Sequence, residues 1–435
     1  MGLIYSQATL TVIAAAGIDP SYGLPGVTST PRKHRTSFQI GSKKFVVSHS
    51  VWDELAESKW NNRGWTYQEA MLSRRRLVFT DNQFYFQCRA MHFPESISFT
   101  LRSLHISNGQ RFPEKLDIWK AFPNRGVGND LLSPRDRIEE FARRELTFDS
   151  DALNAFQGII EEFKGLNRPV HFLSGIPLIP SEYFVRSEIG KAREAAQLTF
   201  GLTWGYRRRN QRKIHRRYAF PSWSWLDWKV ETANRPAQVD FFRLSSTKSP
   251  RAKIILGFFQ NHVEIGVELP DSTVIPWQCN RTLIESKFEE GESPKYLHIK
   301  GWTFDLEIAR NTPEEYWKGC WPGTQRYKAK KSSFDNYCDV DMSSVTVDQL
   351  SVTLKVVLLC STVNAPRIDP FRVGLFIKYS DRIKAYERIG ICDLSDISLH
   401  VRGYYWFKGD EVEEKSSTHA TLGPFHLVKS EIRLG

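Results

Sequence analysis

The stretch that decides how this chain is organised combines a turn, a glycine-tryptophan pair and a basic run, and reads Asn62-Arg63-Gly64-Trp65-Thr66-Tyr67-Gln68-Glu69-Ala70-Met71-Leu72-Ser73-Arg74-Arg75-Arg76-Leu77. Thr66 and Glu69 have the spacing of a capping box, in which a hydroxyl and a carboxylate satisfy backbone N–H groups at a helix start. The stretch therefore predicts a short helix from Thr66 to about Ser73, with Trp65 just outside the cap.

Two alternating runs follow this helix, Arg76–Thr80 and Gln83–Cys88, and only Asp81 and Asn82 separate them. Alternation of apolar and polar residues is typical of strands, and a two-residue connection is typical of a tight hairpin. We therefore predict a β-hairpin directly after the helix.

These motifs resemble the end of a fungal heterokaryon-incompatibility (HET) domain, through the run 63–69, Leu72-Ser73-x-Arg75 and the closing Cys88. Other parts of residues 1–230 resemble the family as well: Met1, Ile4-Tyr5, Ala8, Thr11–Ala15, Gly23-Leu24-Pro25-Gly26, the segment 146–158 and Phe220-Pro221-Ser222-Trp223-Ser224-Trp225. Two strand motifs that precede these in the family have no counterpart, so the resemblance implies a HET domain truncated at its N-terminal side.

HET domains look distantly like Toll/interleukin-1 receptor (TIR) domains, some of which hydrolyse NAD with a helical Glu. The resemblance therefore implies a partial TIR-like α/β domain, with NAD as cofactor only for the complete domain, because the matching Glu would lie before Met1. If that sheet is incomplete, the strand expected at Thr9–Ala15 loses a neighbour and exposes an apolar face and backbone donors.

The rest of the chain divides by pattern. Residues 1–92 form the predicted half-domain, 93–130 a connector and 131–230 a helical region with a basic loop at 206–217. Helices are expected at Ser133–Arg144, burying Ile138 and Phe141, and after Asp151, with one face made of Leu153, Phe156, Ile160 and Phe163.

From residue 231 to 435 short β-like runs predict an antiparallel β-sandwich or barrel, interrupted by a charged insertion near 309–350. The runs are Lys253–Leu256, His262–Val267, Tyr296–Ile308, Ser351–Cys360, Val373–Ile377 and Tyr386–Cys392. The fold class is thus α/β, then helical, then antiparallel β.

Composition narrows the function classes. The formal net charge of +11 either keeps the chain soluble or favours phosphate-bearing partners. We prefer the interpretation that it serves solubility. Six dispersed cysteines without a paired-ligand motif indicate no zinc site and a reducing compartment, and Cys88-x-x-x-His92 is a single half-site. No apolar run is long enough to cross a membrane, so no membrane partner is expected.

Candidate site residues come from the opening stretch and the basic loop. Glu69 is the one catalytic candidate, although its capping role explains it without a ligand. The binding candidates are Arg63, Trp65, Arg74, Arg75, Arg207, Arg208, Arg209, Arg212 and Lys213. The tryptophans Trp204, Trp223, Trp225 and Trp228 are expected in the core.

The sequence thus favours a heterokaryon-incompatibility-type signalling or interaction protein of fungal nonself recognition and programmed cell death. We expect it in the cytoplasm, with a protein partner or self-association and without catalysis in the truncated form. The alternatives are a TIR-like NAD-cleaving enzyme whose catalytic half lies upstream of Met1, and a nucleic-acid binder using the basic loop. Residues 207–217 could also direct the chain to the nucleus.

Overall fold

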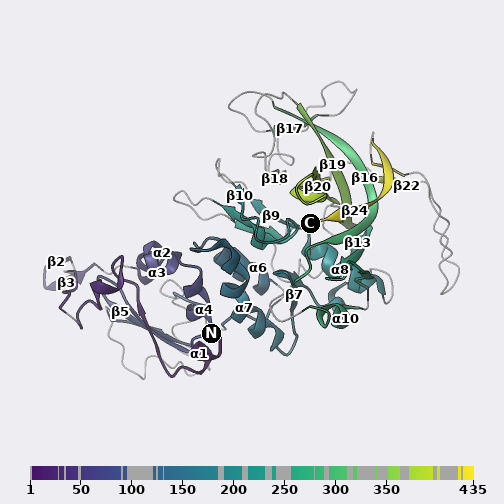
Figure 1. Cartoon of the computed structure of the whole chain (residues 1–435). Helices are drawn as coiled ribbons and strands as arrows, with labels where there is room; N and C mark the ends of the chain where they lie inside the picture. The colour runs from purple at the N-terminus through teal and green to yellow at the C-terminus, as the bar shows by residue number, and fades with distance from the viewer. Residues whose placement is uncertain are drawn as a thin grey trace. The chain divides into compact units, whose positions relative to one another are not determined.

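A computed structural model describes residues 2–27, 29–33, 36–47, 50–89, 92–95, 121–123, 126–130, 132–184, 191–207, 214–230, 238–241, 256–278, 280–288, 293–310, 317–320, 339–340, 351–362, 372–394, 399–401, 420–422 and 425–435 (Figure 1). These residues form two compact units, Met1–Pro169 and Val170–Gly435. The finer domain boundaries inferred from the sequence stay predictions.

The first unit contains a small mixed sheet in the order β1-β4-β5-β6. Its strands are β1 (Thr11–Ala14), β4 (Arg75–Phe79), β5 (Phe84–Cys88) and β6 (His92–Pro94). Strand β1 runs parallel to β4, with Thr11 opposite Arg76, whereas the β4–β5 and β5–β6 pairs are antiparallel. The predicted hairpin is therefore confirmed, with Phe79 opposite Phe84.

Strand β1 confirms the expectation of an exposed sheet edge. Among the described residues it pairs with β4 only. Ile13 is buried, but Val12 is 52% exposed. The strand is shorter than the expected run Thr9–Ala15, and only one of its faces is covered, as is usual for a strand at the edge of a sheet.

Helices of the first unit follow the sequence patterns closely. They are α1 (Gly2–Gln7), α2 (Val51–Glu57), α3 (Lys59–Asn62), α4 (Trp65–Leu72), α6 (Ser133–Ala142) and α7 (Ala152–Lys164), with 3-10 turns at Pro20–Tyr22 and Asp149–Asp151. Ile138, Phe141, Phe156, Ile160 and Phe163 are buried as predicted. Leu153 lies at the margin of that face and is half-buried.

A separate two-stranded hairpin precedes α2. It consists of β2 (Ser37–Ile40) and β3 (Lys43–Val46), and Gly41 takes a φ of 59° in the turn between them. The sequence analysis did not predict β2, because the polar and basic residues of this segment conceal the alternation of Phe38 and Ile40.

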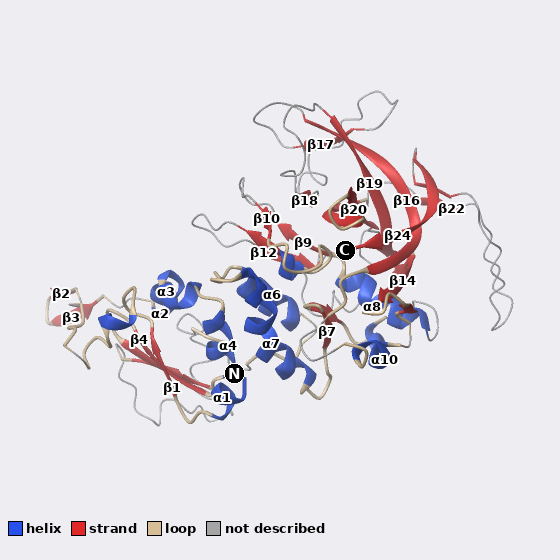
Figure 2. Cartoon of the chain, in the orientation of Figure 1, coloured by secondary structure: helices blue, strands red, loops and turns tan. Residues whose placement is uncertain are grey.

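The second unit is built around a large sheet of mostly antiparallel pairs, as the sequence predicted (Figure 2). Its main path is β15-β14-β16-β19-β20-β21-β24-β23-β22. These strands are β14 (Val263–Glu268), β15 (Val274–Pro276), β16 (Leu297–Arg310), β19 (Ser351–Thr362), β20 (Arg372–Ser380), β21 (Ala385–Asp393), β22 (Leu399–Val401), β23 (Ala420–Leu422) and β24 (Phe425–Leu434).

Smaller elements of this unit surround the sheet. They are β7 (His171–Leu173), β8 (Ile176–Leu178), 3-10 turns at Ser181–Tyr183 and Trp225–Asp227, α8 (Lys191–Gly201), β9 (Trp204–Arg207), β10 (Ile214–Arg216), β11 (Trp228–Val230), β12 (Gln238–Phe241), β13 (Phe259–Asn261), α10 (Arg281–Glu285), β17 (Trp317–Cys320) and β18 (Asp339–Val340). The tryptophans Trp204, Trp223, Trp225 and Trp228 are buried, which confirms their place in the core.

None of the described helices has the length and apolar content needed to span a bilayer.

Candidate functional site

The glycine of the opening stretch is required by a close approach of two chain segments. A Cβ atom on Gly64 would lie 2.4 Å from Cδ2 of Leu146. The Gly64 N–H donates to the carbonyl of Glu145 at 2.7 Å, and the Glu145 N–H donates to the carbonyl of Asn62 at 2.6 Å. The start of α4 is therefore fixed against the chain that follows α6.

The predicted capping box is wrong. Helix α4 begins at Trp65, its N-cap is Gly64 and no side chain caps it. The Thr66 hydroxyl instead lies 2.6 Å from the carbonyl of Trp60 and 2.7 Å from that of Arg63. Thr66 thus joins α4 to the end of α3, because as the second helical residue its hydroxyl faces the preceding turn.

Glu69 is half-buried and has partners within the first unit. Its carboxylate accepts a hydrogen bond from the Tyr5 hydroxyl of α1 and lies in the field of Arg144. Burial, together with this carboxylate, raises the pKa of Tyr5 to about 12. Glu69 therefore anchors α1 to α4.

Arg144 lies beside the same helix and holds three separate groups. Its guanidinium donates to Oδ1 of Asn61 at 2.7 Å, to the Thr66 hydroxyl at 3.1 Å and to the carbonyl of Arg63 at 3.2 Å. It also covers the ring of Tyr67 at 4.8 Å. Burial lowers the pKa of Arg144 to about 10, so the side chain keeps its charge at neutral pH.

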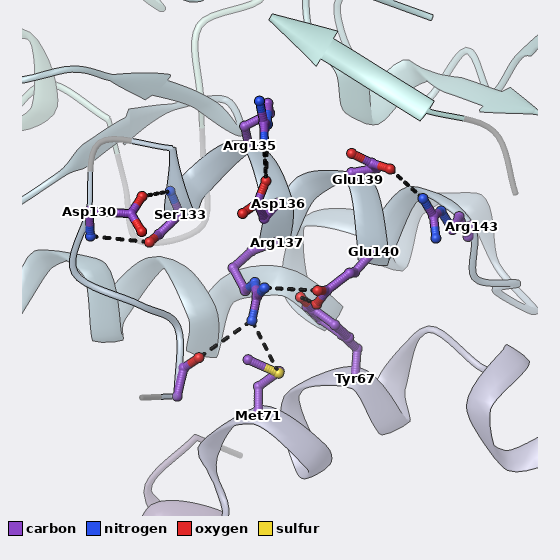
Figure 3. Close-up of polar contacts among 11 residues, drawn as sticks. Tyr67, Met71, Asp130, Ser133, Arg135, Asp136, Arg137, Glu139, Glu140 and Arg143 are labelled. Atoms are coloured by element: carbon purple, nitrogen blue, oxygen red, sulfur yellow. Dashed lines mark hydrogen bonds and ion pairs between the residues drawn. The ribbon is translucent and has the colours of Figure 1, made fainter. Parts of the chain in front are cut away.

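At the hydroxyl end of Tyr67, the carboxylate of Glu140 accepts from two donors at once (Figure 3). The Tyr67 hydroxyl donates to Oε2 of Glu140 at 2.7 Å, and Arg137 donates to Oε1 of Glu140 at 2.8 Å. Arg137 also reaches the carbonyl of Gly126 at 3.4 Å. Burial raises the pKa of Tyr67 well above its ordinary value, so the phenol stays protonated.

We call Tyr5, Glu69, Tyr67, Arg137, Glu140 and Arg144 the α4 network. Each of its two carboxylates accepts from a tyrosine hydroxyl and lies near an arginine. Groups paired in this way are poorly placed to act as nucleophile or general acid, whose proton must move during reaction. The arrangement is suited to holding α1, α4 and α6 together around one buried helix.

The binding candidates of the opening stretch lie outside this network. Trp65 is half-buried, and its indole N–H donates to Oδ2 of Asp151 at 3.3 Å. The side chains of Arg63, Arg74 and Arg75 are exposed, and Arg75 donates to the carbonyl of Thr9 at 3.4 Å. The structure does not gather these four residues into one site.

Sequence reasoning missed the other half of the network. Tyr67 and Glu140 are 73 positions apart, and Arg144 and Asn61 are 83 apart. Only the spacing of Arg137 and Glu140, one helical turn apart on α6, is a local signal of an ion pair. Arg76, which follows the candidate Arg75 in the sequence, was also missed. It is buried, donates to the carbonyls of Ala70 and Met71, and its guanidinium lies 4.8 Å from the centre of the Phe122 ring.

The reading of residues 206–217 as a basic loop was wrong at both ends, which lie in strands, and Arg216 of β10 forms a buried ion pair with Asp227. Arg207 ends β9, where it pairs with Gln238 of β12. Arg208, Arg209, Arg212 and Lys213 lie outside the described residues. Within the residues that the structure describes, no cluster of three or more His, Cys, Asp or Glu side chains could hold a metal ion.

The first unit is thus an α/β unit whose central helix carries the Arg-Gly-Trp-Thr-Tyr-Gln-Glu motif. Residues 1–69 match the family model of the heterokaryon incompatibility protein (HET), and the match ends at Glu69 within α4. No curated protein and no solved structure matches the chain.

Proposed function

We propose that this chain is an interaction protein in a heterokaryon-incompatibility system, acting in nonself recognition and cell death in the fungal cytoplasm. The family match of residues 1–69 is the observation that carries the proposal. The parallel pair β1–β4, with α4 directly before β4, supports a TIR-like arrangement of this sheet.

The same proposal assigns no catalysis to the α4 network. Glu69, the one catalytic candidate, accepts from Tyr5 and neighbours Arg144, which accounts for a half-buried carboxylate in structural terms. A protein of this kind would act by binding a partner at its surface, and α4 would stabilise the fold of the first unit that presents this surface.

Inducible expression of the whole chain in fungal cells tests the proposal. We expect a loss of viability with the wild type and with Gly165→Ala, whose new Cβ would meet only ordinary contacts at 3.6 Å. Gly64→Ala should restore viability, because its Cβ collides with Leu146 and loosens α4. Normal growth of cells that accumulate the folded wild-type chain would overturn the proposal.

A further inference from the structure

The β2–β3 hairpin presents one apolar face. Phe38 lies opposite Phe45 in the register, and the Val47 N–H donates to the carbonyl of Thr36 at 2.8 Å. Because side chains alternate along a strand and directly opposed residues share a face, Phe38, Ile40, Phe45 and Val47 all point to the same side. The other face carries Ser37, Gln39 and Lys44.

This apolar face is open to solvent. Its four side chains are 51% exposed at Phe38, 63% at Ile40, 42% at Phe45 and 40% at Val47. The two phenylalanine rings stack on one another, with centroids 5.4 Å apart and planes 10° apart. A two-stranded hairpin is marginally stable in water by itself, and a contiguous exposed apolar patch commonly marks a binding surface.

The segment that contains the hairpin carries basic residues and no acidic ones. Residues 20–52 contain five Lys or Arg residues, at Arg32, Lys33, Arg35, Lys43 and Lys44, and no Asp or Glu. Arg32 and Lys33 form ion pairs with Glu95 and Asp81. Lys43, opposite Ile40 in the register, lies on the apolar face and is exposed.

We propose that the apolar face of the β2–β3 hairpin docks onto a different protein whose surface combines an apolar floor with an acidic rim. Lys43 would meet the acidic rim while Phe38, Ile40, Phe45 and Val47 cover the floor. The proposal rests on the function proposed above and names the chemistry of the partner.

Charge argues against a second copy of the chain as the occupant. In a two-fold symmetric contact the patch meets its own copy, and the hairpin 37–47 contains Lys43 and Lys44 but no Asp or Glu, so neither copy offers Lys43 a carboxylate from this hairpin. Like charges placed together in this way oppose association, whereas an acidic partner gains from the same lysine.

The strand edges argue against a bilayer. Among the described residues, β2 pairs with β3 and with no other strand, so both outer edges of the hairpin keep unpaired N–H and C=O groups (Figure 1). Lipid acyl chains cannot satisfy such groups, whereas the backbone or side chains of a protein can.

Site-specific photo-crosslinking in fungal cells tests this inference on the full chain. A benzophenone amino acid replaces Ile40, which points to the apolar face, and in a matched control it replaces Gln39, which points to the other. We expect adducts at position 40 with another protein, and mass spectrometry should place them in a segment that contains Asp or Glu. Lys43→Glu should reduce these adducts on the order of tenfold, whereas Lys44→Glu on the opposite face should change them less than about twofold.

Four results would overturn the inference: no adduct at position 40, equal adducts at 39 and 40, an adduct with a second copy of the chain, or an adduct with lipid. For the lipid outcome, the purified chain is irradiated on vesicles of phosphatidylserine and phosphatidylcholine. Charge-dependent crosslinks in cells whose viability is unaffected would keep the docking face and reject the proposed function. Loss of viability without crosslinks would keep the proposed function and reject the docking face.

Discussion

The hydroxyl of Tyr67 donates to Oε2 of Glu140 at 2.7 Å, across 73 residues of sequence, while Arg137 donates to the other carboxylate oxygen at 2.8 Å. The Tyr67 side chain is fully buried between α4, α6 and α7, and its ring stacks on Phe156 at 6.3 Å. This bond couples the helix of the motif to the helices that follow it in the chain.

Removing the Tyr67 hydroxyl should loosen α4. Tyr67→Phe leaves Oε2 of Glu140 without its donor, at a cost of about 1–2 kcal/mol. Peptides of α4 and α6 should then exchange their amide hydrogens about tenfold faster in mass spectrometry, if local opening limits exchange. Tyr379→Phe, at a half-exposed tyrosine of the second unit, should leave these peptides unchanged. Equal exchange in both variants would show that the bond has no stabilising role.

Replacing Arg144 by Ala or by Lys should destabilise the first unit. Arg144→Ala removes the donors to Asn61, Thr66 and the carbonyl of Arg63, and we expect a loss of about 2–4 kcal/mol in the first unit. Arg144→Lys should recover less than half of this loss, because an ammonium cannot reproduce the guanidinium fork. The measurement is chemical unfolding followed by hydrogen exchange of α4.

The neighbouring Arg143 supplies the matched control. It forms a partly exposed ion pair with Glu139 one helical turn away on α6, and Arg143→Ala should cost about 1 kcal/mol, because it removes a single pair within one helix. If Arg143→Ala destabilised the unit as much as Arg144→Ala, the special role of Arg144 would be refuted.

Gly64→Ala should destabilise the first unit, because the added Cβ collides with the side chain of Leu146. Its φ of −61° suits any residue, so the cost of about 1–3 kcal/mol comes from the Cβ placed 2.4 Å from Leu146. Leu146→Ala in the same chain should recover part of the loss in a double-mutant cycle. Additive effects of the two substitutions would contradict this explanation.

The second unit should lose stability in acid through His262. Its Nε2 lies 2.7 Å from the Ser361 hydroxyl, and burial, followed by the field of Arg372, lowers the pKa of His262 from 6.5 to about 4. The unfolded chain therefore binds this proton first, so stability falls as the pH drops from 6.5 towards 4, by up to about 3 kcal/mol. Urea unfolding of the wild type and of His262→Gln between pH 7 and pH 4.5 should show the difference. If the free energy of unfolding of the wild type and of His262→Gln changed with pH in the same way, His262 would not be the cause of the acid sensitivity.

Local patterns were enough to predict several strands and helices, whereas β2, β24 and α8 were missed. The hairpin β4–β5 follows from two alternating runs around Asp81 and Asn82, and α7 from the spacing of Phe156, Ile160 and Phe163. The α4 network could not be predicted, because Tyr67, Glu140 and Arg144 meet only when distant segments pack. The capping role expected of Glu69 was wrong, because its carboxylate accepts from Tyr5 and no side chain caps the helix.

Glu69 accepts from Tyr5 and so joins α1 to α4, and we propose that it takes no part in catalysis. Incubation of the purified chain with NAD, followed by chromatography of the nucleotides, tests this together with hydrogen exchange of α1 in Glu69→Gln. We predict no NAD consumption by the wild type and faster exchange of α1 in the variant. Consumption of NAD by the wild type that Glu69→Gln abolishes, with the exchange of α1 unchanged, would contradict the account.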